Sequence, residues 1–157
     1  MKYSSAISDA QIIVEGYLID KVIDKYTLHD LKRNKPLLIN AEKEISIVPD
    51  FYSEENHIIG EVHSHLGKLK PAQKHKVASD ILKMILFDRD NSYAKMIVVC
   101  SEEERDQLTG GSYLAEAIRQ FNIKIEYFEL EQNLKIKLAE AMKKQNLLES
   151  SKDLRDE

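Results

Sequence analysis

The strongest constraint on the fold is the order in which helical and strand patterns follow one another along the chain. Apolar residues recur at helical spacing over residues 8–26, and two short strand-like segments, 45–51 and 57–63, come after this helix. A continuous apolar strand follows at 95–100, between segments with helical patterns. Such a strand is typical of a sheet that is covered on both faces. The order therefore predicts an α/β fold in which a central mixed β-sheet is flanked by helices.

Local signals place the ends of several other elements. Gly67 is expected to break the chain, and Pro71 suits the first turn of a helix that runs to about Phe87. Ser101, with Glu104 three residues later as its capping-box partner, and Ser112 each precede a short helical pattern and mark its start. The remaining segments are a short first strand at 37–39, a polar hairpin turn at 53–56, a closing strand at 123–127 and a charged amphipathic helix at 131–148.

The size and composition fit one globular domain. The chain has 157 residues, and we expect 1–157 to form a single domain with its core within about 8–130 and a charged helix and tail at 131–157. Hydrophobic residues make up 43% of the chain, which argues against wholesale disorder. The single cysteine, Cys100, excludes an internal disulfide framework and a zinc site built from cysteines. No apolar run reaches membrane-spanning length and the N-terminal residues lack a signal-peptide pattern, so the expected location is the cytoplasm.

Positive charge is concentrated in one stretch of an otherwise acidic protein. The formal net charge is −4, yet no acidic residue occurs between Val62 and Ser79. A second basic cluster, Lys32-Arg33-Lys35, lies upstream. The stretch between Val62 and Ser79 holds four candidate nucleic-acid contacts: Lys68, Lys70, Lys74 and Lys76. The alternative explanation is a solvated, lysine-rich loop and first helical turn.

Two carboxylates are expected to converge at one end of the sheet. Asp50 follows Pro49, which is expected to bend or end its strand, and Glu61 lies in the next strand. If the two strands pair as a hairpin, the carboxylates provide the hard oxygen ligands that Mg²⁺ or Mn²⁺ prefers. His63 lies on the same strand face as Glu61 because side chains alternate along a strand. Glu15, in the middle of the first helix, is a third candidate acid, and the alternative for each acid is an ordinary surface carboxylate.

The helix at 71–87 carries a polar stripe. Its members are three or four residues apart: Gln73, Lys76, Asp80 and Lys83. A stripe of this kind is often only a solvated face. The N-terminus of this helix, however, comes just after the strand that holds Glu61, and free N–H groups at a helix N-terminus favour phosphate.

Together these residues resemble the motif of the PD-(D/E)xK nuclease superfamily. The residues that carry the resemblance are Glu15, Pro49-Asp50, Glu61-Val62-His63 and Gln73, in that order along the chain. The similarity covers roughly 8–130 and implies a restriction-endonuclease-like core that hydrolyses DNA phosphodiester bonds. One position departs from the family, because its lysine two residues after the glutamate is His63 here. Lys70 or Lys76 is expected to replace that lysine, and we favour Lys76 over Lys70, and both over His63.

The resemblance also implies a role for each residue. Asp50 and Glu61 are expected to bind Mg²⁺ or Mn²⁺, and Glu15 to hold an outer-shell water or a second metal ion. Gln73 is expected to position the lysine or the phosphate, and His63 to act as a weaker substitute for the lysine. The expected partner is nucleic acid, DNA before RNA, without a membrane. A homodimer is one of the states that the sequence allows.

Two alternatives stay open. The segment Gly60-Glu61-Val62-His63-Ser64-His65 is similar to the His-x-His core of JAMM zinc metalloproteases, with His63 and His65 as the zinc ligands. Leu66 stands where that family has a proline, and its serine–aspartate pair is missing. The other alternative is a non-catalytic module on the same fold that binds nucleic acid or protein.

Overall fold

A five-stranded mixed sheet lies at the centre of a three-layer α/β domain. The computed structural model describes residues 5–153, with side chains for 9–146. In sheet order the strands are β1 (Lys32–Arg33), β4 (Phe51–Ser53), β5 (Ile58–His63), β6 (Ala94–Val99) and β7 (Ile123–Tyr127). The helices are α1 (Ser5–Tyr26), α2 (Pro71–Phe87), α3 (Glu102–Leu108), α4 (Tyr113–Gln120) and α5 (Gln132–Asp153). The predicted α/β domain with a central mixed sheet is confirmed.

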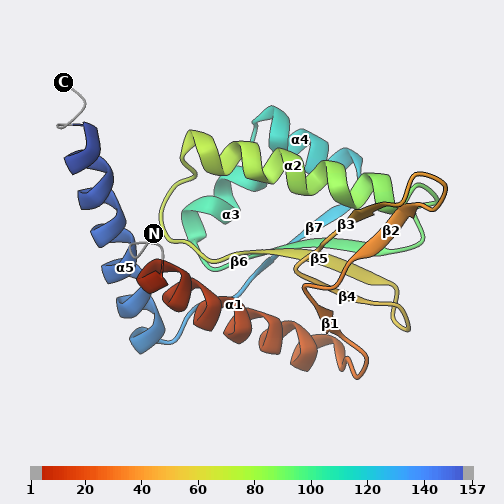
Figure 1. The fold of residues 1–157 in the computed structure, drawn as a ribbon, viewed down its shortest axis with the longest axis horizontal. Helices are drawn as coiled ribbons and strands as arrows, with labels where there is room; N and C mark the ends of the chain where they lie inside the picture. Colours follow the sequence, from red (N-terminus) through yellow and green to blue (C-terminus); the bar gives the residue numbers. More distant parts are fainter. Residues whose placement is uncertain (1–4, 154–157) are drawn as a thin grey trace.

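Helices cover both faces of this sheet (Figure 1). α1 and α5 lie against each other on one face, and α2, α3 and α4 lie on the other. Within the described side chains, the buried apolar residues form two clusters, one for each face. The strand β6 contributes to both clusters, Ile97 to one and Val98 to the other. This explains why its sequence is apolar without alternation. In the described part of the chain, no helix is both long and apolar enough to cross a bilayer.

The ends of the middle elements agree with the sequence signals. α2 begins at Pro71 and ends at Phe87 as predicted. The side chains of Ser101 and Ser112 cap α3 and α4, because each hydroxyl accepts a hydrogen bond from a backbone N–H three residues later. α1 begins at Ser5, three residues before the predicted start. α5 ends at Asp153, five residues beyond the predicted end, and its Leu138 is fully buried in the core.

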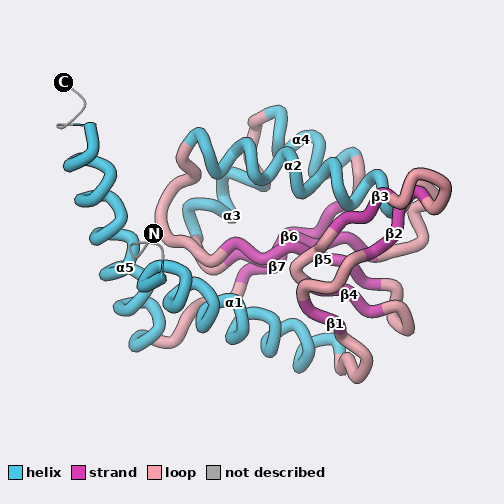
Figure 2. Tube along the Cα trace, viewed as in Figure 1, coloured by secondary structure: helices cyan, strands magenta, loops and turns pink. Residues whose placement is uncertain are grey.

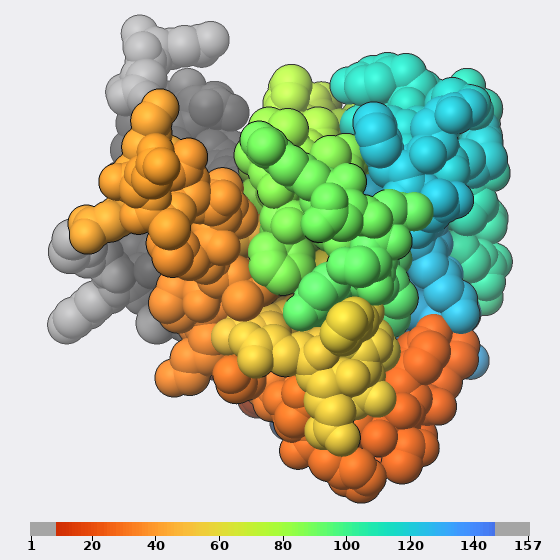
Figure 3. Space-filling model, turned by 90° about the vertical axis from the view of Figure 1, so that its right-hand side faces the viewer, coloured from red at the N-terminus to blue at the C-terminus, as the bar shows by residue number. Residues whose placement is uncertain are grey.

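The predicted strand at 45–51 is wrong as a single element. Its first part is β3 (Ile45–Ile47), which pairs with β2 (Leu37–Asn40) in a separate two-stranded ribbon, and its last residue begins β4. Pro49 lies in the break and is buried. Because proline has no N–H group, it cannot continue the ladder of hydrogen bonds. Figure 2 shows the ribbon apart from the central sheet, and in the space-filling view the ribbon (orange) forms a protruding lobe beside α2 (green, Figure 3).

The β4–β5 hairpin fixes the position of the acidic residues. The two strands are antiparallel, with Phe51 opposite Gly60, and the turn between them covers 54–57. β5 then pairs in parallel with β6, so α2 forms the crossover between these neighbouring strands. One step beyond the Phe51–Gly60 pair, this register brings Asp50 beside Glu61. The predicted hairpin is therefore confirmed.

Gly60 lets the hairpin close over a buried aromatic ring. A Cβ atom on Gly60 would lie 2.2 Å from Cζ of Phe51, whose side chain is fully buried. We expect Gly60→Ala to lower the free energy of unfolding by about 1–3 kcal/mol, because the core has to make room for the methyl group. Denaturant unfolding measures this change. Gly111→Ala is the control, since no heavy atom lies within 4 Å of a Cβ there. Equal stability of the two variants would contradict the packing argument.

Candidate functional site

Two carboxylates meet at the end of the β4–β5 hairpin, Asp50 from the residue just before β4 and Glu61 from β5. Oδ2 of Asp50 accepts a hydrogen bond from the backbone N–H of Val62 at 2.7 Å, which holds the side chain against β5. Glu61 precedes Val62 and is hydrogen-bonded to Asp50. The structure thus brings together the two acids that the sequence singled out as metal ligands. Their role as ligands stays a prediction.

Glu61 is a buried acid with a strongly perturbed pKa. Only 2% of the residue is exposed. Burial raises the pKa of Glu61 to about 8, and the charge of Asp50, the hydrogen bond to Asp50 and the charge of Asp80 act in the same direction. The ammonium group of Lys83 opposes these effects. The pair therefore has more negative charge than the surrounding protein compensates, which favours binding of a cation or a proton.

Lys83 and Asp80 of α2 extend the acidic pair into a charged network. Nζ of Lys83 lies 2.8 Å from Oε1 of Glu61 and 3.2 Å from Oδ1 of Asp80. Asp80 is 2% exposed, so the polar stripe of α2 faces the sheet at this point and is not a solvated face. The sequence placed Lys83 on the stripe but did not select it as a site residue. Its spacing of seven residues from Lys76, two helical turns, is the signal that pointed to this face.

His63 is held between two carboxylates. Nε2 of His63 lies 2.9 Å from Asp80, and Nδ1 lies 2.5 Å from Glu104 of α3. Burial alone would lower the pKa of His63, but the hydrogen bonds and charges of Asp80 and Glu104 outweigh it and raise the pKa to about 9. His63 is thus a fixed, buried cation.

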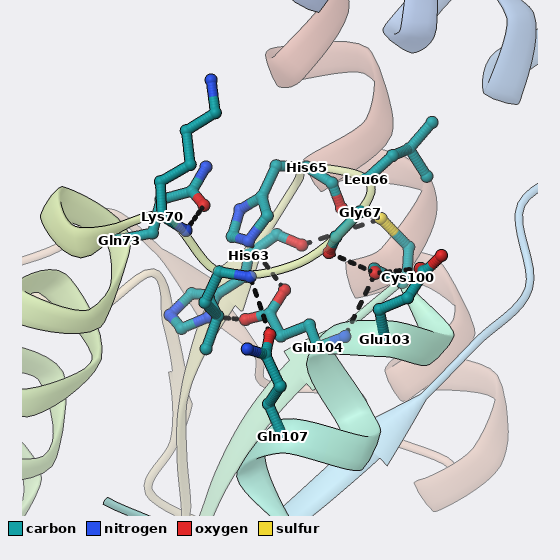
Figure 4. Close-up of polar contacts among 12 residues, drawn as sticks. His63, His65, Leu66, Gly67, Lys70, Gln73, Cys100, Glu103, Glu104 and Gln107 are labelled. Atoms are coloured by element: carbon teal, nitrogen blue, oxygen red, sulfur yellow. Dashed lines mark hydrogen bonds and ion pairs between the residues drawn. The ribbon is translucent and has the colours of Figure 1, made fainter.

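Glu104 connects His63 to the loop that follows β5. Its other oxygen lies 2.9 Å from Nε2 of His65, and Figure 4 shows the carboxylate reaching from α3 towards both histidines. The same loop is fixed by hydrogen bonds from Ser101 Oγ to the Gly67 carbonyl and from the Leu69 N–H to Oε1 of Gln107, both 2.7 Å. The sequence indicated Glu104 only as part of a helix cap, so this contact was missed.

A cleft beside the acidic pair contains three of the other predicted residues. Its volume is about 280 Å³, and Glu15 of α1 faces Gln73 and Lys76 of α2 across it. Burial and then the charge of Asp50 raise the pKa of Glu15, while the charges of Lys76 and Arg33 lower it. These couplings put Glu15 within electrostatic reach of Asp50 and of two cations, Lys76 and Arg33. Oε1 of Gln73 also accepts the Lys70 N–H at 2.8 Å, which helps to cap α2.

The four predicted nucleic-acid lysines are distributed over three places. Lys76 lines the cleft with Glu15. Lys70 turns away from it, and its Nζ donates a hydrogen bond to Oδ1 of Asn146 on α5 at 2.8 Å. Lys68 and Lys74 line a larger hollow of about 650 Å³ beside α3 and α4. Of the two lysines predicted to replace the family lysine, only Lys76 lies at the cleft.

The donor set suits Mg²⁺ better than zinc. Among residues 9–146, no three His, Cys, Asp or Glu side chains are grouped as a metal cage. Zinc sites use three or four protein ligands, and both ring nitrogens of His63 already face carboxylates. Mg²⁺ keeps several waters and needs only one or two carboxylates. Oε1 of Glu61 is buried and, in the described part, has the Lys83 ion pair but no hydrogen bond of good geometry. An under-satisfied carboxylate oxygen of this kind fits a hard cation.

No protein-family model, curated protein or solved structure matches the chain. The chemistry of the site therefore has to come from its own residues. These provide an acidic pair with one buried member, a nearby cleft with one acid and one flexible lysine, and a network of paired charges behind Glu61.

The raised pKa of Glu61 predicts how stability depends on pH. In the unfolded chain Glu61 ionises near 4.5, whereas the folded pair keeps its proton to about pH 8. Folding therefore takes up a proton between these two pH values. The free energy of unfolding consequently falls as the pH rises through this range, by up to ~1.4 kcal/mol per pH unit. We expect the unfolding free energy in EDTA to fall more steeply between pH 5 and 8 in the wild type than in Glu61→Gln. Denaturant titrations at several pH values measure both slopes. If the unfolding free energies of the wild type and of Glu61→Gln changed in parallel with pH, Glu61 would ionise normally.

Proposed function

We propose that this chain is a metal-dependent nuclease-like protein that hydrolyses phosphodiester bonds in DNA. The observation that carries the proposal is the Asp50–Glu61 pair, with Glu61 buried, near a cleft that is lined by Val62, Glu15 and Lys76. Two hard carboxylates for a divalent cation, next to a flexible cation for a phosphate, are what hydrolysis of a phosphodiester requires.

The order of elements supports a restriction-endonuclease-like core. α1 carries Glu15, the β4–β5 hairpin carries Asp50 and Glu61, and α2 carries Gln73 before the parallel strand β6. The PD-(D/E)xK superfamily, which the sequence resembles, has its motif in this order on a helix, strands and a helix. The departure at His63 remains, so the proposal requires the lysine to come from another element.

Asp50 and Glu61 are the residues that would hold Mg²⁺ or Mn²⁺. A divalent cation there supplies a bound water of lowered pKa and neutralises charge at the phosphorus. Val62 keeps Asp50 in position through its N–H group. Lys83 keeps the Glu61 carboxylate oriented through its ion pair. Glu15, on the far side of the cleft, would hold an outer-shell water.

Lys76 is the amine that we assign to the phosphate. It is exposed, its stem is flexible, and its charge is felt at Glu15 across the cleft. Gln73 lies one turn earlier and lines the same cleft, so it is placed to position either Lys76 or the phosphate. His63 donates both ring N–H groups to carboxylates, so it serves as a fixed positive charge behind Glu61 and not as a base.

We expect the wild type to cut DNA with Mn²⁺ or Mg²⁺ and to be inactive in EDTA. Asp50→Asn and Glu61→Gln are expected to lower the cleavage rate by about 100-fold or more, because each removes a charged ligand at the reaction centre. Glu42→Gln is the control, since this acid is exposed on the turn of the β2–β3 ribbon. Gel assays on plasmid, duplex and single-stranded substrates measure the rates.

The lysine assignment is tested in the same assay. Lys76→Ala is expected to reduce cleavage by about 10-fold or more, whereas Lys70→Ala keeps the wild-type rate because Lys70 faces α5. Loss of activity in Lys70→Ala alone would contradict the assignment. A wild type that binds DNA but cuts neither DNA nor RNA would favour the non-catalytic module. Stoichiometric zinc in the purified protein would favour the metalloprotease alternative.

A further inference from the structure

A second hollow lies on the other side of Glu15. It has a volume of about 260 Å³ and shares Ile12 and Glu15 with the cleft that contains Lys76. Its remaining lining comes from α1 and from the chain after β1, namely Gly16, Ile19, Arg33 and Asn34. The two hollows therefore run past Glu15 in sequence, with one cation in each.

Arg33 is held over the helix surface in this second hollow. Its Nη2 donates a hydrogen bond to Oδ1 of Asp20 at 2.8 Å, which fixes the guanidinium. Its Nη1 lies over Gly16, since a Cβ on that residue would be 4.0 Å from this nitrogen. A guanidinium carries five N–H donors in a planar fork. Among the described residues, Asp20 is the one hydrogen-bond partner of the Arg33 guanidinium, through Nη2.

The backbone connects this hollow to the acidic pair. The N–H of Asn34 donates a hydrogen bond to the carbonyl of Asp50 at 3.1 Å. Asn34 has φ 52°, a left-handed conformation that asparagine tolerates better than most residues. The turn that presents Arg33 is thus anchored on the residue proposed as a metal ligand.

We infer that Arg33, Asn34 and Gly16 form a second phosphate-binding subsite, which holds a backbone phosphate of the same DNA strand next to the phosphate that is cut. Lys76 contacts the strand on one side of Glu15, and Arg33 contacts it on the other. A planar guanidinium suits bidentate contact with a phosphate, and Asn34 adds an amide donor. This inference rests on the proposed function for the identity of the strand.

Neither helix stability nor side-chain packing explains why residue 16 is a glycine. It lies in the middle of the 22-residue helix α1, where glycine costs about 1 kcal/mol relative to alanine. Its missing side chain leaves the helix backbone open on the floor of the hollow, where a phosphate or sugar can approach closely. A methyl group would fit beside Arg33 at ordinary contact distance, so packing does not demand glycine here.

The test is DNA binding in EDTA, where no metal-dependent cleavage occurs. Fluorescence anisotropy with a labelled single-stranded oligonucleotide gives the Kd at several salt concentrations. We expect Arg33→Gln to weaken binding about 3- to 10-fold and to reduce the salt slope by about 0.7, the value for one lost phosphate contact on a single strand. Lys35→Gln is the matched control, because this exposed lysine carries the same charge two residues away but lines neither hollow. It is expected to leave the salt slope unchanged.

A neutral methylphosphonate, moved one position at a time along the oligonucleotide, locates the contact. At one position it should weaken binding to the wild type but add nothing to the defect of Arg33→Gln. At a neighbouring position it should show the same non-additivity with Lys76→Ala. The subsite would be overturned if the effects of the methylphosphonate and of Arg33→Gln on binding added up at every position. It would also be overturned if Arg33→Gln and Lys35→Gln weakened binding equally.

Gly16→Ala separates binding from folding. We expect this variant to have a higher unfolding temperature, because alanine favours the helix, and yet to bind the oligonucleotide more weakly than the wild type. Higher stability with unchanged binding would overturn the role of the open helix surface.

Cleavage of the same oligonucleotide with Mn²⁺ distinguishes the subsite from the proposed hydrolysis. Binding that depends on Arg33 without any cleavage would support the subsite and contradict the nuclease activity. Cleavage and binding that are the same in Arg33→Gln and Lys35→Gln would support the activity and overturn the subsite. A wild type that binds no DNA would overturn the subsite outright.

Discussion

The rest of the site depends on the placement of a half-buried acid against a buried one. Asp50 directly precedes β4 and Glu61 lies in β5, and the Val62 N–H fixes the Asp50 carboxylate beside Glu61. Burial of Glu61 and then the charge of Asp50 disfavour the ionised form of Glu61, so its pKa is raised and the site favours a proton or a cation. Acids with such perturbed pKa values cluster at functional sites.

Behind this pair, charges of alternating sign run through the interior between β5, α2 and α3. Glu61 contacts Lys83, Asp80 contacts both Lys83 and His63, and Glu104 contacts His63 and His65. Behind the pair, His63, Asp80 and Glu104 thus each contact a group of opposite sign, which is the condition for burying charges. The arrangement fixes the orientation of Glu61 and of the loop after β5.

The fold and half of the site follow from local sequence signals. Helix starts at Pro71, Ser101 and Ser112 are decided by backbone chemistry within a few residues, and so is the apolar pattern of β6. The meeting of Asp50 and Glu61 follows from hairpin register, which is also local. Glu104 could not be predicted, because its contact with His63 joins residues 41 positions apart and depends on how α3 packs. The direction of the Lys70 side chain towards α5 could not be predicted from the sequence for the same reason.

Without a divalent cation the acidic pair is under-compensated. An NMR titration of the side-chain carboxyl carbon of Glu61, with and without Mg²⁺, tests this. We expect a pKa near 8 in EDTA and a marked decrease when Mg²⁺ is added, because the cation then stabilises the ionised form. An ordinary glutamate pKa in EDTA, or a raised pKa that Mg²⁺ leaves unchanged, would contradict it.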